Sequence, residues 1–153
     1  MTHRVARRRD GADRPLAMTF RRNAAGFHEA AEAALPQYPE ATRYVLAIAI
    51  ELALKAHLLH RGISDDWNRV YLRHDLSKAL RFARRAGFNG APAALPELAA
   101  LLGPYYQAHA ISRRPPEAVA SVCWSLACRM VRDLIDAVVE AAGFDASDHE
   151  GAA

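Results

Sequence analysis

The sequence predicts an all-α protein, folded as an up-and-down bundle of four main helices with one short additional helix. Apolar residues recur at helical spacing in successive segments, and no convincing strand pattern is present. With 153 residues, of which 52% are hydrophobic, the chain can bury one sizeable core. We therefore expect one domain over residues 18–143, between a flexible basic tail at 1–17 and a flexible acidic tail at 144–153.

The first two helices are expected over residues 18–35 and 40–62. The first, "MTFRRNAAGFHEAAEAAL", has a single apolar face, and the following "PQYP" stops it. The second, "EATRYVLAIAIELALKAHLLHRG", is apolar on several faces, and Gly62 is placed to end it. A helix that is apolar on several faces must be covered on several sides, so this is the expected central helix.

Two shorter segments follow. Residues 74–87, "HDLSKALRFARRAG", predict a helix with Asp75 as its N-cap and Gly87 at its end. The segment "LPELAALLGPYYQAHA" predicts the short additional helix, which should end near Gly103 or just beyond it because Pro104 interrupts the pattern.

A long closing helix is expected over residues 115–143, with Pro116 in its first turn. Its apolar stripe consists of Val119, Val122, Leu126, Met130, Leu134 and Val138. Three further apolar residues, Val131, Ile135 and Val139, spread beyond that stripe. Such a wide apolar surface favours a homodimer that forms through this helix.

Composition argues for a cytoplasmic protein. Charged residues interrupt the best apolar run, so no membrane span is predicted, and no apolar segment of a signal peptide follows the basic N-terminus. Cys123 and Cys128 are not part of a metal-binding pattern, and we interpret both as small buried residues in a reducing compartment. We expect neither a metal nor another cofactor.

The expected central helix carries a charged pair, Glu51 and Lys55, one helical turn apart. Both share a stripe with apolar residues, so at least partial burial is expected, and a buried charge without partners is costly. An antiparallel pair of helices would bring the start of the next helix back to this position. We therefore predict a polar network of Glu51, Lys55, His74 and Asp75.

The helix over residues 74–87 also carries a basic face. Arg73, Lys78, Arg81 and Arg85 are close together, and Asp75 is the one acid between residues 69 and 90. This pattern fits either a solvated basic face or a site for phosphate or nucleic acid.

The stretches "ELALKAHLLHRG" and "HDLSKALRFARRAGF", followed by a long last helix, resemble the HEPN domain family. The resemblance covers roughly residues 20–142. It implies a bundle of four or five helices, frequent dimerisation, and a place in toxin–antitoxin or defence modules beside a nucleotidyltransferase. It also implies metal-independent ribonuclease activity, which many members have.

The ribonucleases of that family carry an arginine, four to six residues, and then a histidine near the start of the last helix. Here Arg113 and Arg114 stand at that place, but no histidine follows at this spacing; Arg69 and His74 match it elsewhere. We therefore favour an RNA- or nucleotide-binding or assembly module. The alternatives are a metal-independent ribonuclease with a variant site, for which Arg69, His74 and Arg113 are candidates, and a protein-interaction module that binds no nucleic acid.

Overall fold

The computed structural model describes residues 13–107 and 121–146. Its helices are α1 (Arg14–Ala34), α2 (Pro39–His60), α3 (Asp65–Trp67), α4 (Leu76–Arg85), α5 (Leu95–Gln107) and α7 (Trp124–Ala146), with a π-helical segment η1 (Asn68–Leu72) between α3 and α4. These two ranges contain no strand, which confirms the all-α fold class.

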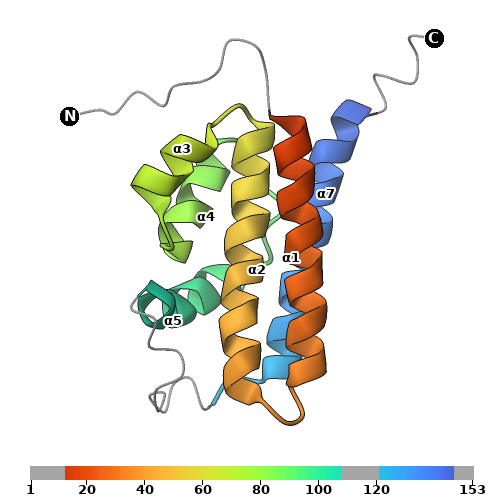
Figure 1. Ribbon diagram of the computed structural model, residues 1–153, viewed down its shortest axis with the longest axis vertical. Coiled ribbons are helices and arrows are strands. Elements are labelled where there is room, and N and C mark those ends of the chain that lie inside the picture. Colours follow the sequence, from red (N-terminus) through yellow and green to blue (C-terminus); the bar gives the residue numbers. More distant parts are fainter. Residues whose placement is uncertain (1–12, 108–120, 147–153) are drawn as a thin grey trace.

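The other helices lie on two sides of α2 (Figure 1). The long helices α1 and α7 lie on one side and run with α2 along the long axis of the molecule, and the shorter α3, α4 and α5 lie together on the other side. Helix α2 contacts α1, α7, α4 and α5. The described helices thus form a bundle, in which three helices are long and the others are shorter.

Helix α2 is the centre of the core, because its sequence is apolar on several faces. Leu46, Ile50, Leu54 and Leu58 are fully buried along its length. The hydroxyl of Thr42 donates to the carbonyl of Ala31 at 2.9 Å and fixes α2 against α1. The core positions the polar residues discussed below, because each lies on a helix that this packing holds in place.

Two glycines end helices as predicted. Gly62 and Gly87 have φ values of +87° and +91°. After α2, the amides of Gly62 and Ile63 bond the carbonyls of Leu59 and Leu58. The same pattern follows α4 at Gly87. This is the Schellman arrangement, in which a left-handed residue satisfies the last helical carbonyls.

Helix α1 begins at Arg14, four residues before the predicted residue 18. Asp13 accepts a hydrogen bond from the amide of Leu16 at 3.2 Å. Pro15 suits the first turn, because amides at this position have no acceptor within the helix and proline has no amide hydrogen to leave unpaired. Residues 14–17, which we had placed in the basic tail, are therefore helical. Helix α7 likewise continues to Ala146, three residues into the predicted acidic tail; residues 1–12 and 147–153 lie outside the described ranges.

The prediction that the short helix would end near Gly103 is wrong, because α5 continues through Pro104 to Gln107. Proline removes one backbone hydrogen bond. The continuation buries Tyr106 against α2, where its hydroxyl bonds Glu51 at 2.9 Å. Burial of this ring and its hydrogen bond offset the loss at Pro104.

Helix α7 begins at Trp124, and residues 121–123 are not helical, so the predicted start at residue 115 is too early. Pro116 and Val119 lie outside the described ranges. Of the predicted apolar stripe, Leu134 and Val138 are buried but Leu126 is exposed. Val131 and Ile135, which were predicted to lie beyond the stripe, belong to the core of this chain. Of the three residues on which the homodimer prediction depends, only Val139 is an exposed large hydrophobic residue.

Two further predictions concern the membrane and the cysteines. Among the described helices, none combines the length and apolar character that crossing a membrane requires. Cys128 is buried as expected, but Cys123 is exposed and precedes α7. The expectation of two buried cysteines in one helix fails at Cys123, because the helix starts after it.

Candidate functional site

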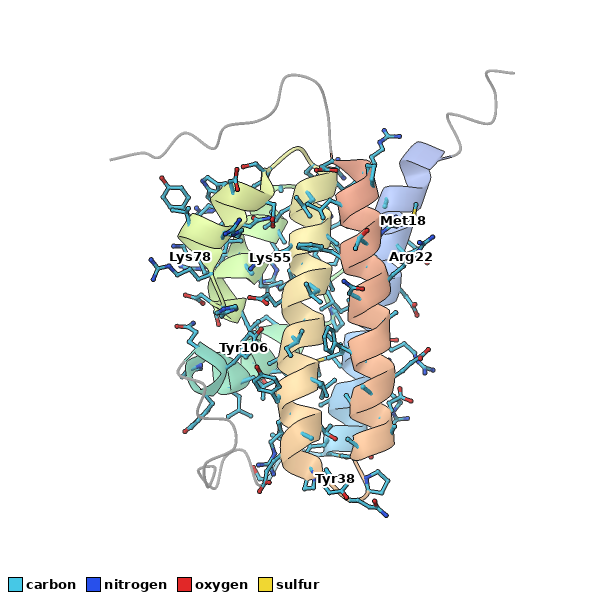
Figure 2. All side chains as sticks on the ribbon, viewed as in Figure 1. Met18, Arg22, Tyr38, Lys55, Lys78 and Tyr106 are labelled. Carbon is cyan, nitrogen blue, oxygen red and sulfur yellow. The ribbon has the colours of Figure 1, made fainter. Side chains whose placement is uncertain are left out.

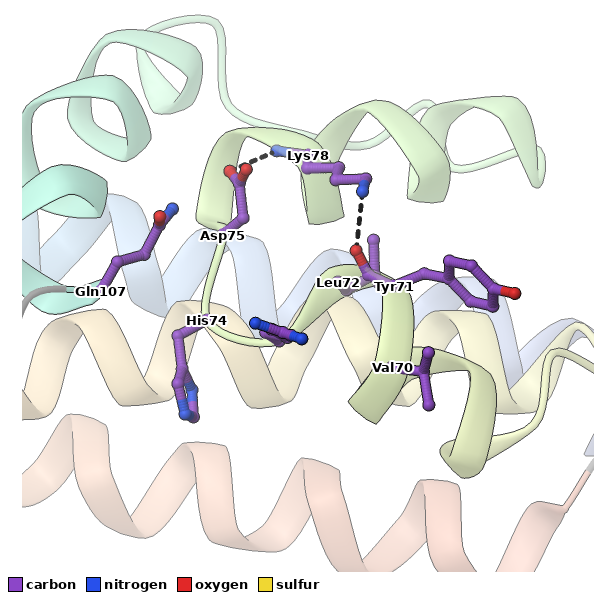
Figure 3. Close-up of a pocket in the computed structure, with 8 residues that line it drawn as sticks. Val70, Tyr71, Leu72, His74, Asp75, Lys78 and Gln107 are labelled. Carbon is purple, nitrogen blue, oxygen red and sulfur yellow. Dashed lines mark hydrogen bonds between the residues drawn. The ribbon is translucent and has the colours of Figure 1, made fainter. Parts of the chain in front are cut away.

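A pocket of about 540 Å³ lies where η1, α4 and the end of α5 meet. Its lining residues are Val70, Tyr71, Leu72, Arg73, His74, Asp75, Lys78 and Gln107. Figure 3 shows Asp75 and Lys78 on one side of the connecting turn and His74 on the other, with Gln107 at the end of α5. Its charged side chains come from Arg73, Asp75 and Lys78.

The wall of this pocket is a tight turn over residues 72–75. The amide of Asp75 donates to the carbonyl of Leu72 at 3.0 Å and closes the turn. Arg73 has φ +49° and ψ −118°, which is the first central position of a type II′ turn and normally a glycine position. A conformation of this kind costs a residue with a side chain about 1–3 kcal/mol. The strain lies at the pocket itself.

Asp75 connects the turn to α4. Its carboxylate accepts a hydrogen bond from the amide of Lys78 at 3.0 Å and caps the helix as predicted (Figure 3). The Lys78 ammonium in turn donates to the carbonyl of Tyr71 at 2.7 Å. Asp75 thus fixes the start of α4, and Lys78 fixes η1 against α4. These two hydrogen bonds hold the elements on both sides of the pocket in place.

Beneath the pocket lies a buried polar network centred on Glu51. Its Oε1 accepts from Lys55 Nζ at 3.2 Å and lies 2.7 Å from His74 Nδ1. Its Oε2 accepts from the hydroxyl of Tyr106 at 2.9 Å. Figure 2 shows Lys55, Lys78 and Tyr106 on the same side of α2. Three side chains from different parts of the chain therefore meet one buried carboxylate.

Burial and the nearby carboxylate control the chemistry of this network. Burial, followed by the charge of Glu51, raises the pKa of Tyr106 far above its ordinary value, so the hydroxyl stays a donor. Lys55 also donates to the carbonyl of Arg73 at 2.6 Å. Glu51 and Lys55 thus both have hydrogen-bond partners within the core.

His74 links the buried network to the pocket. Its side chain is 51% exposed, while its Nδ1 lies within hydrogen-bond distance of Glu51. The ring also packs edge-on against Tyr106, with centroids 5.3 Å apart. A carboxylate at Nδ1 selects the tautomer that carries its proton there, which leaves Nε2 as the basic nitrogen of the neutral ring. This arrangement orients the histidine for proton transfer or for an anion.

The structure brings together three of the four residues predicted for the network: Glu51, Lys55 and His74. The fourth, Asp75, follows His74 directly, but its side chain caps α4 instead. Tyr106 takes the fourth place, and sequence reasoning missed it. The expected helix end near Gly103 placed Tyr106 outside the helix. The available signal was that Tyr106 continues the helical spacing of apolar residues beyond Pro104.

The predicted basic face is divided. Arg73 and Lys78 line the pocket, whereas Arg81 and Arg85 do not. The Arg85 guanidinium instead lies 5.3 Å from the centre of the Phe82 ring, and Arg81 is exposed. The positive charges therefore converge at one end of α4 and are solvated at the other.

Of the three catalytic candidates, only His74 lies at the pocket. Arg69 is exposed, pairs with Asp66 at 3.9 Å and is not among the pocket residues. Arg113 lies outside the described residues. The matching spacing of Arg69 and His74 therefore does not place the two side chains in one site, and Arg73 is the arginine that lines the pocket beside the histidine.

The side chains that line the pocket indicate which class of ligand it can bind. Within residues 13–107 and 121–146, no group of three or more histidine, cysteine, aspartate or glutamate residues could hold a metal ion. Comparisons with protein-family models, curated proteins and solved structures give no match. The pocket offers an arginine, a lysine and an oriented histidine near the start of α4. Such side chains can bind an anion, most commonly a phosphate group.

Proposed function

We propose that this protein is a HEPN-like helical bundle that acts as an RNA- or nucleotide-binding module, with a phosphate group held in the pocket. The convergence of Arg73, His74 and Lys78 on one pocket is the observation that carries the proposal. The resemblance of the two sequence stretches to the HEPN family is consistent with it.

The chemistry of the three side chains suits phosphate. Arginine offers a planar set of donors that matches two phosphate oxygens, and lysine adds a compact charge. His74 adds a third polar group, whose ring Glu51 orients through the 2.7 Å contact with Nδ1. Because each neutralised phosphate of RNA releases condensed counterions, binding should weaken steeply as salt is raised.

A metal-independent ribonuclease is the second candidate, and the His74–Glu51 contact favours it. In this mechanism the Nε2 of His74 takes the proton of the 2′-hydroxyl, and Arg73 stabilises the negative charge on the phosphate. The leaving 5′-oxygen must also receive a proton. The pocket-lining residues include no second histidine to supply it, so we favour binding without efficient cleavage.

Incubation with total RNA in the presence of a chelator separates the two candidates. We expect wild type and His74→Ala to leave the RNA intact, and wild type to bind it in a salt-sensitive way that the variant Lys78→Glu/Arg81→Glu loses. Metal-independent cleavage that His74→Ala abolishes would replace the binding module by the ribonuclease. If wild type binds no RNA at low salt, the proposal fails, and the basic residues form a solvated or protein-binding face.

The proposal also includes a cytoplasmic homodimer that works beside a nucleotidyltransferase in a toxin–antitoxin or defence module. The family resemblance supports this part, and the exposed Leu126 and Val139 on α7 offer apolar surface for a second copy. Sedimentation velocity at tens of micromolar tests the dimer. A clean monomer at that concentration would remove it.

A further inference from the structure

We propose that the turn over residues 72–75 is a preorganised receptor for a terminal phosphate monoester, with Arg73 as its binding arginine and Lys55 as the residue that positions it. The inference rests on the proposed function, because it takes the pocket to be a phosphate site. It goes further by naming the kind of phosphate and the device that holds the arginine.

The backbone conformation of Arg73 is one that favours glycine over a residue with a side chain. With φ +49° and ψ −118°, this residue occupies a conformation that glycine adopts without strain. A glycine would therefore build the same turn more favourably. The arginine instead places an exposed guanidinium on the wall of the pocket, at a cost to stability. Strain of this kind concentrates at functional sites.

Both backbone polar groups of Arg73 are held. Its amide donates to the carbonyl of Asn68 at 2.9 Å, which closes the π-helical turn. Its carbonyl accepts from Lys55 at 2.6 Å, and Lys55 is buried and paired with Glu51. The strained peptide is thus fixed from η1 on one side and from the core on the other. Lys55 acts through this carbonyl and determines where the guanidinium points.

The charges in the pocket favour a terminal phosphate over an internal one. Arg73 and Lys78 are cationic, and the Asp75 carboxylate, which also lines the pocket, caps α4 and is partly offset by the positive end of that helix. Glu51 and Lys55 form a salt bridge beneath them, which adds no net charge to the site. A phosphate monoester carries about two negative charges near pH 7 and a diester carries one. Two converging cations therefore match the monoester.

The shape of the site leads to the same conclusion. A volume of about 540 Å³ is typical of a pocket for a small molecule or a chain end, and it is too small for a duplex. A groove that follows a nucleic-acid backbone needs cations spread along it. Here Arg81 and Arg85, which would continue such a track along α4, do not line the pocket. A free nucleotide and the 5′ end of an RNA share the chemistry that this site fits.

The test compares a single-stranded RNA oligonucleotide carrying a 5′-phosphate with the same oligonucleotide carrying a 5′-hydroxyl. We expect wild type to bind the phosphorylated form about tenfold or more tightly. Adenosine 5′-monophosphate serves as competitor: displacement at a concentration similar to that of the phosphorylated oligonucleotide indicates a nucleotide site, and weaker displacement indicates an RNA end. Equal binding of the two oligonucleotides would overturn the inference while the proposed function stands, and binding of neither would remove both.

Two variants test the device. Arg73→Gly should bind the phosphorylated oligonucleotide about tenfold or more weakly and yet unfold at a higher temperature than wild type, because it relieves the strain. Arg73→Ala keeps the strain, so it should lose as much affinity for the phosphorylated oligonucleotide without a higher unfolding temperature. Unchanged affinity or a lower unfolding temperature for Arg73→Gly would contradict the assignment.

Positioning by Lys55 is tested with Lys55→Met, which removes the donor to the Arg73 carbonyl and leaves Glu51 in place beneath His74. This change should weaken binding in wild type but have no further effect in Arg73→Gly, because it acts through Arg73. Circular dichroism confirms that each variant is folded. Equal losses in both backgrounds would show that Lys55 does not act through the turn.

Discussion

Lys55 extends from the C-terminal half of α2 to the pocket wall, where its Nζ lies 2.6 Å from the carbonyl oxygen of Arg73. The same ammonium pairs with Glu51, whose other partners are His74 and Tyr106. One buried network therefore supports both the packing of α2 against α4 and α5 and the shape of the candidate site. Changes to this network should alter stability in ways that can be measured separately from binding.

Lys55→Met should destabilise the protein by about 3 kcal/mol or more, because it leaves the buried carboxylate of Glu51 without its cation. Urea unfolding followed by circular dichroism measures the free energy of unfolding. Arg69→Met is the matched control: Arg69 pairs with Asp66 at the surface, and exposed pairs contribute little. If the two variants were equally stable, Glu51 and Lys55 would not form a stabilising buried pair.

Tyr106→Phe should cost about 1–3 kcal/mol, because the ring stays while the hydroxyl that donates to Glu51 is lost. Tyr38→Phe removes a hydroxyl from an exposed ring and should change little. The same urea experiment compares both variants with wild type. A silent Tyr106→Phe would mean that water replaces the hydroxyl at Glu51 without cost.

Acid should destabilise the protein partly through His57. Burial lowers the pKa of this histidine from 6.5 to about 4, while its Nε2 lies 3.2 Å from the carbonyl oxygen of Ala86. The unfolded chain then binds a proton that the folded chain does not. This contribution, on the order of 3 kcal/mol, is present above pH 6.5 and is lost as the pH falls towards 4.

His57→Gln isolates that contribution, because glutamine keeps a donor for Ala86 but does not titrate. The free energy of unfolding is measured for both proteins between pH 7 and pH 4. We expect the variant to lose less stability than wild type over this range. Parallel curves would show that His57 does not cause the acid sensitivity.

Substitutions of glycine by alanine should have opposite signs at two kinds of position. Gly62→Ala and Gly87→Ala place a side chain at positive φ and should each cost about 1–2 kcal/mol. Gly26→Ala, in the interior of α1 with open space around it, should stabilise by about 0.5–1 kcal/mol. Thermal unfolding of the three variants decides. A stabilised Gly62→Ala would contradict the role of Gly62 as a helix end.

The parts of the fold that depend on local chemistry were predictable from the sequence. Asp75, Gly62 and Gly87 determine where helices begin or end through their own backbone and side-chain preferences, and each lies where the pattern placed it. The contact between Glu51 and Lys55 also follows from helical spacing. Their link to His74 required only that the next helix return along α2.

Features that depend on contacts distant in sequence were not predictable. Tyr106 reaches Glu51 across 55 positions, and the burial of its ring carries α5 past a proline that locally favours a stop. The strained turn gave no signal, because an arginine occupies the position where a glycine would have indicated it. The late start of α7 at Trp124 was concealed by two prolines, at 115 and 116, that are typical of a first turn.

The central claim is that phosphate binds in the pocket rather than along a basic face. Fluorescence anisotropy of a 5′-phosphorylated single-stranded RNA at low salt tests it with two variants that each reverse two positive charges on or beside α4. Arg73→Glu/Lys78→Glu changes the pocket, and Arg81→Glu/Arg85→Glu changes exposed residues outside it. We predict that the pocket variant loses affinity about tenfold or more, while the other stays within about threefold of wild type. Equal losses in the two variants would contradict the account.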